Sequence, residues 1–444
     1  MSVSPARAAA FDILLRVDRE ASYASDLLHS QTYERLSTAD HALATELVMG
    51  VLRWRSRLDG EISTASSQPL NKLDLEILIA LRLAVYQFLW LDRIPQRAAL
   101  HESVELVKRA RKRSAAAFVN AVLRKLSASK TGASIAPDQN PSPEILAHSQ
   151  AHPLWLVARW VDQYGLSAAR QICQHNQTVP ATAIRLRNPA AEQQLPGEGI
   201  TLAAGALLAS ARRVQAGEIA KTQPFRTRDI VIQDEASQLV AALVGRGSNI
   251  LDCCAAPGGK TLALADQNPS STITAVELHS HRARLLQKLI LPRASQIHIV
   301  AADAQHLPLT LPFDRVLADV PCTGTGTLAR NPEIKWRLQP GDLAELHQRQ
   351  IAILRSALAQ VSPGGRLIYS TCSLEKEENE DVVEQALAAN PSLRLLDCRP
   401  ELGRLTASGE LTWAGPALTR GPYLRTLPGI HPCDGFFAAI LESI

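Results

Sequence analysis

Two of the seven cysteines stand in short polar turns that directly follow apolar runs of the chain. Cys322 lies in the stretch Asp-Val-Pro-Cys-Thr-Gly, and Cys372 lies in Thr-Cys-Ser. Free cysteines usually pack in the core, and that interpretation suits Cys173, Cys253 and Cys398. It suits the two turn cysteines less, because loops that follow strands face the ligand crevice of a parallel sheet. We therefore expect these two thiols to take part in chemistry.

A thiolate can split one hard reaction into two easier steps by forming a covalent intermediate. The C5 carbon of cytosine is a poor nucleophile, but a thiolate that adds at C6 turns it into an enamine able to attack a methyl-sulfonium group. Asp319, three residues before Cys322, is placed to hydrogen-bond N3 and the exocyclic amine of such a base. The second thiol, or a water that it positions, can assist release of the first. Spacing alone does not say which thiol attacks.

A turn of small residues follows the predicted strand Asn249–Asp252 and reads Cys254-Ala255-Ala256-Pro257-Gly258-Gly259-Lys260. Its glycines let the backbone approach a ligand closely, and the helix that follows favours negative groups at its N-terminus. A Walker A loop would need glycine in place of Cys254, and no complete Gly-x-Gly-x-x-Gly is present. The turn therefore suits a cofactor that lacks phosphate and carries an amino-acid end and a ribose.

Two acids follow the next predicted strands. Glu277 ends the strand Thr272–Glu277, 18 residues after Gly259 and near the roughly 20-residue offset at which an acid meets ribose hydroxyls. Asp303 follows the strand Ile297–Val300 and could bind an adenine amine. Each acid alone is more often a cap or turn residue. The small-residue turn, Glu277 and Asp303 nevertheless follow three successive predicted strands, and this arrangement favours a cofactor site.

The elements that must position these residues alternate between strand and helix from residue 229 onward. Such alternation predicts an α/β domain with a mostly parallel sheet, whose ligands bind at the carboxyl ends of the strands. The expected strands are Asn249–Asp252, Thr272–Glu277, Ile297–Val300, Arg315–Asp319 and Gly365–Thr371.

The remainder of the chain predicts three further parts. Residues 1–127 carry apolar residues at helical spacing and are expected to form an all-helical domain. Residues 128–143 are rich in Ser, Gly and Pro and predict a linker. Residues 144–228 predict a small mixed α/β domain, with a helix over Pro153–Tyr164 and a strand over Ala183–Leu186. A chain of 444 residues is expected to hold two or three domains, so multidomain architecture follows.

Composition and charge narrow the class of protein. Net charge is only +4, which supports a polyanionic partner only where the cations cluster. They do cluster in the basic segment Lys108–Arg113, for which we weigh phosphate binding against a solvated helix face. An odd cysteine count, the absence of zinc-type spacing and the lack of a signal or membrane segment predict reduced thiols, no metal and a cytoplasmic protein with no membrane partner.

The small-residue turn, with Asp319-Val-Pro-Cys322, Thr371-Cys372-Ser373 and the ending Asp-Gly-Phe-Phe437, resembles the motifs of the RNA 5-methylcytosine methyltransferases of the nucleolar-protein/Sun type. The resemblance covers nearly the whole chain. It implies a Rossmann-like class I methyltransferase domain and an N-terminal domain like the antitermination factor NusB. It also implies that S-adenosylmethionine contacts residues 254–260, Glu277, Asp303 and Asp319.

The resemblance further assigns roles and a substrate. Cys372 is implied as the nucleophile and Cys322 as the residue that helps release the product. A cytosine of 16S ribosomal RNA is implied as the target, since bacterial members with this layout act there. Two positions depart from the family pattern, Glu277 where Asp is usual and Val320 where Ala is usual. We expect neither to abolish activity.

The stretch Arg330-Asn-Pro-Glu-Ile-Lys335-Trp336 also resembles the family pattern. It is interpreted either as a loop packed by Trp336 or as a segment whose Arg330 and Lys335 hold RNA phosphates. The glutamates that follow Cys372 are expected to form the first turns of a helix and are given no catalytic role. These glutamates are Glu375, Glu377, Glu378 and Glu380.

Alternative functions remain open at this point. The chain could be a non-catalytic RNA-binding or ribosome assembly factor. Its intact cofactor turn and both thiols argue against a methyltransferase fold that has lost its activity. It could also methylate cytosine in transfer RNA. An amino-methyltransferase would need an Asn/Asp-Pro-Pro-Tyr type of loop where this chain has Asp-Val-Pro-Cys. We expect a monomer.

Overall fold

A computed structural model describes residues 3–444 except 31, 34, 129–140, 291–295 and 311. The chain divides into two compact units. The first comprises Met1–Val179 with Leu328–Arg337, and the second comprises Pro180–Thr327 with Leu338–Ile444. The predicted linker, residues 128–143, lies mostly outside the described residues. The four-part domain division stays a prediction.

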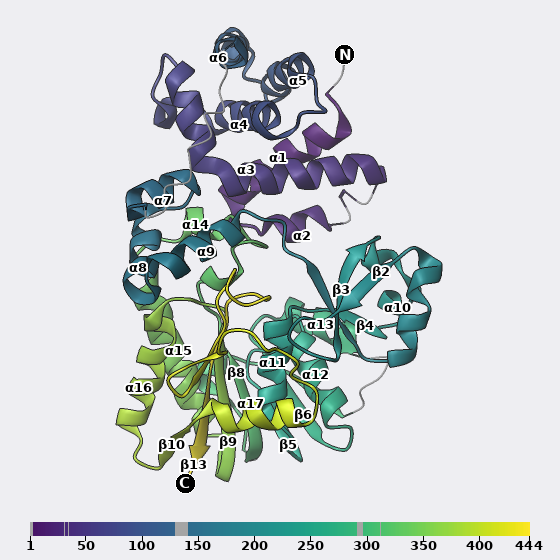
Figure 1. Ribbon diagram of the computed structural model, residues 1–444, viewed down its shortest axis with the longest axis vertical. Coiled ribbons are helices and arrows are strands. Elements are labelled where there is room, and N and C mark those ends of the chain that lie inside the picture. Colours follow the sequence, from purple (N-terminus) through teal and green to yellow (C-terminus); the bar gives the residue numbers. More distant parts are fainter. Residues whose placement is uncertain (1–2, 31, 34, 129–140, 291–295, 311) are drawn as a thin grey trace. The chain divides into compact units, whose positions relative to one another are not determined.

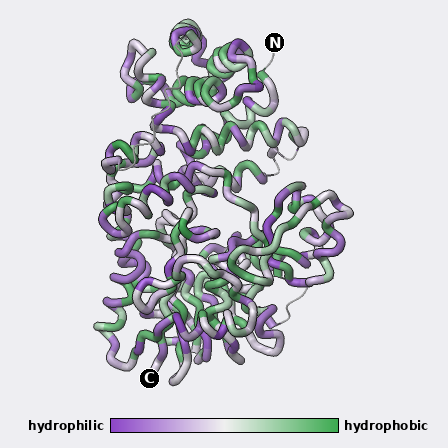
Figure 2. Tube along the Cα trace, in the orientation of Figure 1, coloured by the Kyte–Doolittle hydropathy of each residue, from purple (hydrophilic) through white to green (hydrophobic). Residues whose placement is uncertain are grey.

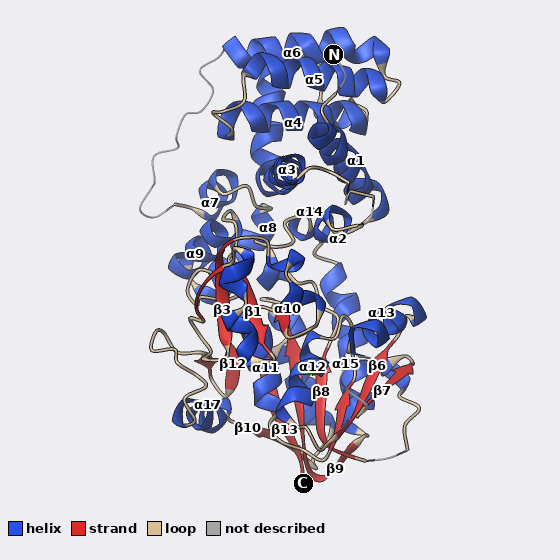
Figure 3. Ribbon diagram, turned by 90° about the vertical axis from the view of Figure 1, so that its right-hand side faces the viewer, coloured by secondary structure: helices blue, strands red, loops and turns tan. Residues whose placement is uncertain are grey.

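The first unit is helical throughout its described residues, as the apolar periodicity predicts (Figure 3). The predicted helix Pro153–Tyr164 is confirmed as α8. Apolar side chains of α1, α3, α4, α5 and α6 share one core. Figure 2 shows that hydrophobic and hydrophilic residues alternate along these helices. Its α-helices are α1 (Pro5–Glu20), α2 (Ala24–Leu28), α3 (Thr38–Ala65), α4 (Leu75–Trp90), α5 (Gln96–Arg109), α6 (Ala116–Ala128), α7 (Pro143–Ser149), α8 (Leu154–Tyr164), α9 (Leu166–Asn176) and α14 (Ile334–Arg337).

The segment Leu328–Arg337, which contains α14, comes from far along the chain and belongs to this helical unit. Its side chains are tied to backbone groups of the first three helices and the loop between α1 and α2. The hydrogen bonds join Glu333 to the amide of Ala24 (2.9 Å), Lys335 to the carbonyl of Arg53 (2.9 Å), Trp336 to the carbonyl of Leu52 (2.5 Å) and Arg337 to the carbonyl of Ala21 (2.7 Å). The helical unit is thus discontinuous in sequence.

The second unit begins with a small antiparallel sheet in the order β2-β3-β1-β4. The predicted strand Ala183–Leu186 is confirmed within β1. Buried Ile184, Leu195 and Ile230 belong to the core beneath this sheet. Its elements are β1 (Thr182–Leu186), β2 (Thr201–Ala204), β3 (Ala211–Ala216), α10 (Gln223–Arg226) and β4 (Ile230–Ile232).

A larger mixed sheet follows in the order β11-β12-β13-β9-β8-β5-β6-β7, with β10 paired to β13 (Figure 1). Strands β5 to β9 are parallel, as expected, and all five predicted strands are confirmed with shifts only at their ends. The parallel strands are β5 (Asn249–Asp252), β6 (Thr272–Glu277), β7 (Ile297–Ala301), β8 (Phe313–Asp319) and β9 (Val361–Thr371). The antiparallel ones are β10 (Leu393–Leu396), β11 (Thr419–Arg420), β12 (Tyr423–Arg425) and β13 (Phe437–Ser443).

Helices cover both faces of the larger sheet, so consecutive residues of its central strands β5, β8 and β9 are buried. Core contacts place α11, α12 and α17 on one face and α15 and α16 on the other. Their bounds are α11 (Glu235–Val244), α12 (Gly259–Gln267), α13 (Ser280–Ile290), α15 (Asp342–Leu358), α16 (Glu380–Ala389) and α17 (Cys398–Ala407). Strand order reverses at β5, because β6 and β7 lie on one side and β8 and β9 on the other. That reversal is where an open α/β sheet binds its ligand.

Candidate active site

The small-residue turn lies at the carboxyl end of β5, where the strand order reverses. Gly258 has a φ of 112°, and a Cβ atom there would lie 2.5 Å from Cδ1 of Leu286. The backbone conformation therefore favours glycine, and a Cβ atom would also require the side chain of Leu286 on α13 to move. Gly259 begins α12, so the turn presents the N-terminus of a nine-residue helix to the crevice.

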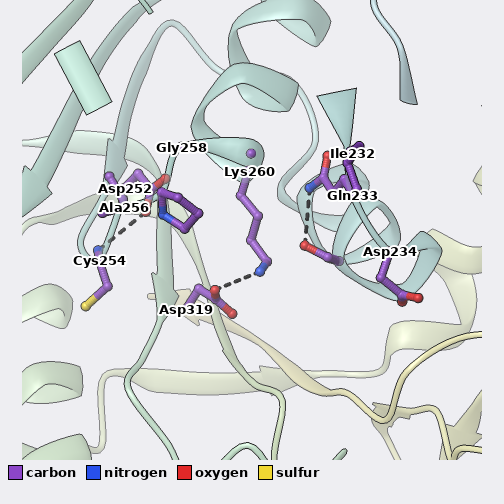
Figure 4. Close-up of a pocket in the computed structure, with 13 residues that line it drawn as sticks. Ile232, Gln233, Asp234, Asp252, Cys254, Ala256, Gly258, Lys260 and Asp319 are labelled. Atoms are coloured by element: carbon purple, nitrogen blue, oxygen red, sulfur yellow. Dashed lines mark hydrogen bonds and ion pairs between the residues drawn. The ribbon is translucent and has the colours of Figure 1, made fainter. Parts of the chain in front are cut away.

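A cavity of about 220 Å³ opens beside this turn (Figure 4). Acidic side chains and one lysine provide its charges. The lining residues are Ile232, Gln233, Asp234, Ser237, Asp252, Cys254, Ala255, Ala256, Pro257, Gly258, Gly259, Lys260 and Asp319. All seven residues of the predicted cofactor turn, and Asp319, thus line one cavity.

Asp252, the last residue of β5, fixes the small-residue turn by hydrogen bonds. It accepts hydrogen bonds from Thr261 Oγ1 at 2.7 Å and from the Cys254 amide at 3.4 Å. Burial raises the pKa of Asp252 to about 6. Burial also raises the pKa of the Cys254 thiol, which suits a packing role for that cysteine better than a reactive one.

Glu277 and Asp303 end up near the predicted edge of the sheet but do not line this cavity. Glu277 ends β6 and is 5% exposed, and its Oε1 accepts from the His279 amide at 3.0 Å. Asp303 follows β7 and accepts from the Gln305 amide at 2.9 Å. Both carboxylates therefore serve as turn caps here, and their predicted contacts with ribose and adenine stay predictions.

Lys260 and Asp319 form an ion pair across the crevice, with Nζ 2.7 Å from Oδ2 (Figure 4). Asp319 lies opposite Ser370 in the β8–β9 register, and Ser370 Oγ donates to Oδ1 at 2.7 Å. Burial opposes the charged form of Lys260, but the charge of Asp319 and its hydrogen bond outweigh burial and raise the pKa of the lysine. Both carboxylate oxygens of Asp319 are therefore held in a fixed direction.

The two predicted thiols lie side by side, with Cys322 Sγ 3.3 Å from Cys372 Sγ. Their loops follow the neighbouring parallel strands β8 and β9, which accounts for the meeting. The hydrogen bond to Cys372 and burial together raise the pKa of Cys322 well above its ordinary range. The thiol of Cys372 also contributes to the raised pKa of Lys260. The structure thus brings together Cys322, Cys372, Asp319 and Lys260.

Glu378 is a residue of this region that the sequence did not single out. It was expected to belong to the first turns of a helix and to have no catalytic role, and its side chain is completely buried at the end of a short 3₁₀ helix, Lys376–Glu378. Its carboxylate accepts hydrogen bonds from Thr323 and Ser373, the residues that directly follow the two cysteines. In the sequence, each of the two cysteines is followed by a hydroxyl residue, Thr323 or Ser373. This repetition was the signal that could have indicated a common hydrogen-bond acceptor.

The hypothesis that Lys335 holds RNA phosphates is wrong. Lys335 is 1% exposed and donates to the carbonyl of Arg53 inside the helical unit. Burial lowers its pKa well below the ordinary range of lysine, so the ammonium form is disfavoured. The alternative interpretation, a loop packed by Trp336, agrees with the hydrogen bond of that indole to Leu52. The role of Arg330 stays a prediction.

The basic segment Lys108–Arg113 spans the end of α5 and the turn that follows it, and several of its cations have acidic partners. Lys108 pairs with Glu105, and Arg109 pairs with Asp12, both at 2.7 Å. Lys112 pairs with Asp74 at 2.9 Å. The local excess of positive charge is therefore smaller than the sequence indicates.

Neither a metal site nor a membrane span emerges from the described residues. Within them, no group of three or more His, Cys, Asp and Glu side chains is placed to hold a metal ion. No helix in the described ranges has the length and hydropathy needed to cross a membrane.

Comparisons with known proteins match both units. Residues 243–442 match the family described as 16S rRNA methyltransferase RsmB/F, and residues 4–128 match the NusB family. The probable ribosomal RNA small subunit methyltransferase B of Bacillus subtilis is 33% identical, with 100% of each chain covered. The ribosomal RNA small subunit methyltransferase B of Pseudomonas syringae pv. tomato is 31% identical, covering 100% of this chain and 97% of that one.

Solved structures share the fold. A methyltransferase homologue from Pyrococcus horikoshii is 26% identical, covers 68% of this chain and 99% of its own, and has a TM-score of 0.57. The crystal structure of PH0851 covers 100% of both chains with a TM-score of 0.82 at 22% identity. The expected architecture, a NusB-like helical domain followed by an α/β methyltransferase domain, is confirmed.

Proposed function

The chain belongs to the 16S rRNA methyltransferase RsmB/F family, and on this basis we propose that it methylates C5 of a cytosine in 16S ribosomal RNA with S-adenosylmethionine as the methyl donor. The observation that carries the proposal is the pair of thiols 3.3 Å apart beside the Lys260–Asp319 ion pair. A single thiol would serve as a nucleophile, but two in contact suit addition followed by elimination. We expect the protein to act in the cytoplasm as a monomer.

The residues of the small-residue turn fit S-adenosylmethionine. Gly259 leaves space in which a Cβ atom would only touch Gln233 at 3.5 Å, so the backbone lies open to a ligand there. Carboxylates of the cavity suit the amino group and the sulfonium, and Lys260 suits a carboxylate. Residues 254–260, Glu277, Asp303 and Asp319 would hold the cofactor. When bound, S-adenosylmethionine supplies an electrophilic methyl group.

Cys372 acts as the nucleophile in this proposal. Its thiolate adds to C6 of the target cytosine, and C5 gains the electron density it needs to accept a methyl group. Asp319 accepts a hydrogen bond from the exocyclic amine and orients the base, because Lys260 and Ser370 fix the direction of its carboxylate.

Cys322 acts in the release step. Its raised pKa keeps it a neutral thiol while Cys372 is free, and the largest cause is the hydrogen bond between the two sulfurs. Once Cys372 is bonded to C6, Cys322 is held beside the adduct, because the two sulfurs lie 3.3 Å apart in the free protein. Cys322 gives its proton to water, its thiolate then takes the C5 proton, and the C6–sulfur bond breaks as Cys372 leaves as a thiolate.

Bisulfite sequencing of ribosomal RNA from cells with and without the gene tests the proposal. We expect one cytosine of 16S ribosomal RNA to lose its methyl group when the gene is deleted, and to regain it with the wild-type chain but not with Cys372→Ala. Loss of methylation only in transfer RNA would contradict the substrate. Unchanged methylation in every RNA, with an assembly defect restored by the Cys372 variant, would favour a non-catalytic assembly factor.

A further inference from the structure

Glu378 is a fully buried acid whose carboxylate meets four hydrogen-bond donors. Its Oε1 accepts from the Thr323 amide at 2.8 Å and from Gln350 Nε2 at 2.9 Å. Its Oε2 accepts from the hydroxyls of Thr323 and Ser373. All four donors are neutral groups. Burying a carboxylate that has only neutral hydrogen-bond donors costs desolvation free energy, so stability alone does not explain why Glu378 is buried here.

Two of the three residues bonded to Glu378 share a feature, since each directly follows one of the two thiols. Thr323 follows Cys322 and Ser373 follows Cys372, and their hydroxyl oxygens are themselves 3.0 Å apart. One side chain therefore ties together the two loops that carry the sulfur atoms.

Glu378 is itself held firmly in its loop. Tyr369, which lies in β9 and is completely buried, donates from its hydroxyl to the Glu378 carbonyl at 2.6 Å. The next residue, Asn379, donates from Nδ2 to the Ser373 carbonyl at 2.9 Å. A carboxylate fixed at its backbone and bonded to both loops can set the distance between them.

We propose that Glu378 is a positioning residue that holds the Cys322 and Cys372 loops at the separation that the two-thiol reaction requires. Its importance for catalysis rests on the proposed function, whereas its effect on the sulfur separation does not. The negative charge near Cys322 adds a second effect, because it opposes ionisation of that thiol.

Glutamine and alanine separate the geometric effect from the charge. In Glu378→Gln, the amide oxygen can still accept from the Thr323 amide and Gln350, while the amide nitrogen can donate to the two hydroxyl oxygens. The clamp then survives without its charge. Glu378→Ala removes every hydrogen bond and leaves buried donors unpaired. Glu384→Ala is the matched control, since Glu384 is an exposed glutamate on α16.

The first measurement is the rate at which oxidised glutathione links Cys322 to Cys372. The disulfide is reduced to two glutathione molecules as the two thiols lose two protons and two electrons, and peptide mapping follows the link. We expect Glu378→Gln and Glu384→Ala to react within about threefold of wild type, and Glu378→Ala at least about tenfold more slowly. Equal rates for Glu378→Ala and wild type would overturn the proposal.

The second measurement is steady-state methyl transfer to 16S ribosomal RNA. We expect Glu378→Ala to lower kcat about 100-fold with KM unchanged within about threefold, because a misplaced thiol impairs the reaction and not the binding. Glu378→Gln should restore most of kcat. A rise in KM as large as the fall in kcat, or a Glu378→Gln variant as slow as Glu378→Ala, would contradict a positioning role.

A further variant covers the case in which Glu378→Ala does not fold. Thr323→Val removes the hydroxyl that bonds Glu378 and Ser373, with little change of shape, and we expect it to slow the glutathione reaction about threefold to tenfold. A rate equal to wild type in that variant would count against the clamp. If wild-type protein fails to methylate RNA, the proposed function fails, but the glutathione series still decides the role of Glu378.

Discussion

The two units of the molecule each contain a lysine withdrawn from solvent, and the pKa values of these lysines move in opposite directions. Lys260 of the second unit has 14% of its side chain exposed and forms an ion pair with Asp319. Lys335 of the first unit is 1% exposed and bonds to a backbone carbonyl. Burial disfavours the charge of both, but only Lys260 has a carboxylate that outweighs burial and raises its pKa.

The difference shows that the partner of a buried lysine, and not burial itself, indicates its role. Lys260 and Asp319 together present a fixed charge pattern to a crevice, which is an arrangement suited to binding and catalysis. Lys335 and its neighbour Trp336 instead fill a helical core and satisfy backbone groups. Substitutions at Lys260 and Asp319 should therefore change the reaction. Substitutions at Lys335 and Trp336 should change stability.

Cys372→Ala is expected to have the largest effect of any change in the crevice. Because the nucleophile is lost, methyl transfer should fall by about 10⁴-fold or more, as measured with radiolabelled S-adenosylmethionine and 16S ribosomal RNA. The matched variant Cys322→Ala should instead accumulate an RNA–protein adduct that survives denaturation. Normal turnover by Cys322→Ala, or an adduct that forms without Cys372, would show that the two roles are assigned wrongly.

Lys260→Met should lower the rate of a single turnover by about 100-fold, because Asp319 loses the partner that fixes its direction. The measurement compares single-turnover rates at saturating RNA for this variant and for Lys335→Met. We expect the latter to keep its rate within about threefold. Equal losses in both variants would break the distinction between the two lysines.

Lys335→Met should raise the free energy of unfolding at pH 7. The pKa of Lys335 is lowered in the folded state, so between that lowered pKa and about 10.4 the unfolded chain binds a proton that the folded chain lacks. Wild-type stability therefore rises with pH toward that value. The variant avoids this cost of neutralising a buried lysine and loses only about 1 kcal/mol for the hydrogen bond.

Urea unfolding at pH 7 and pH 9.5 checks this expectation. The advantage of the methionine variant should shrink at the higher pH, because the wild-type lysine is then closer to neutral in the unfolded chain as well. A variant that is less stable by the same amount at both values would show that Lys335 keeps its charge in the folded state.

Charge removal in the basic segment Lys108–Arg113 should have the smallest effect. Three of its cations already have acidic partners, so Arg111→Gln with Arg113→Gln should reduce the slope of log affinity against log salt by about 1 to 2. Filter binding to 16S ribosomal RNA between 50 and 200 mM salt measures the slope. If the slope does not change, this segment does not contact phosphates.

Much of the second unit could be predicted because its parallel strands are short apolar runs, each followed by a polar turn. Adjacent parallel strands bring their carboxyl ends together, so the meeting of Asp319, Cys322 and Cys372 followed from the expected topology. The small sheet was predicted only in part. Its strand β3 reads Ala-Arg-Arg-Val-Gln-Ala, which carries little apolar alternation.

The burial of charged residues was the part that sequence could not indicate. Glu378 and Lys335 belong to residue types that are almost always exposed, so a pattern of types assigns them to a surface. Their true environments depend on partners distant along the chain, Gln350 for one and Arg53 for the other. The strand β13 was missed for a different reason, since its buried residues form a continuous run without the alternation of a half-buried strand.

The segment Leu328–Arg337 has a consequence for the order in which the protein folds during synthesis. The helices up to Val179 leave the ribosome about 150 residues before this segment does, which corresponds to roughly 10–30 s at ordinary rates of translation. Through that interval the helical unit lacks the side chains of Lys335 and Trp336 that bond to α3. The first part of the chain to be made is thus completed only after the loop carrying Cys322 has been made.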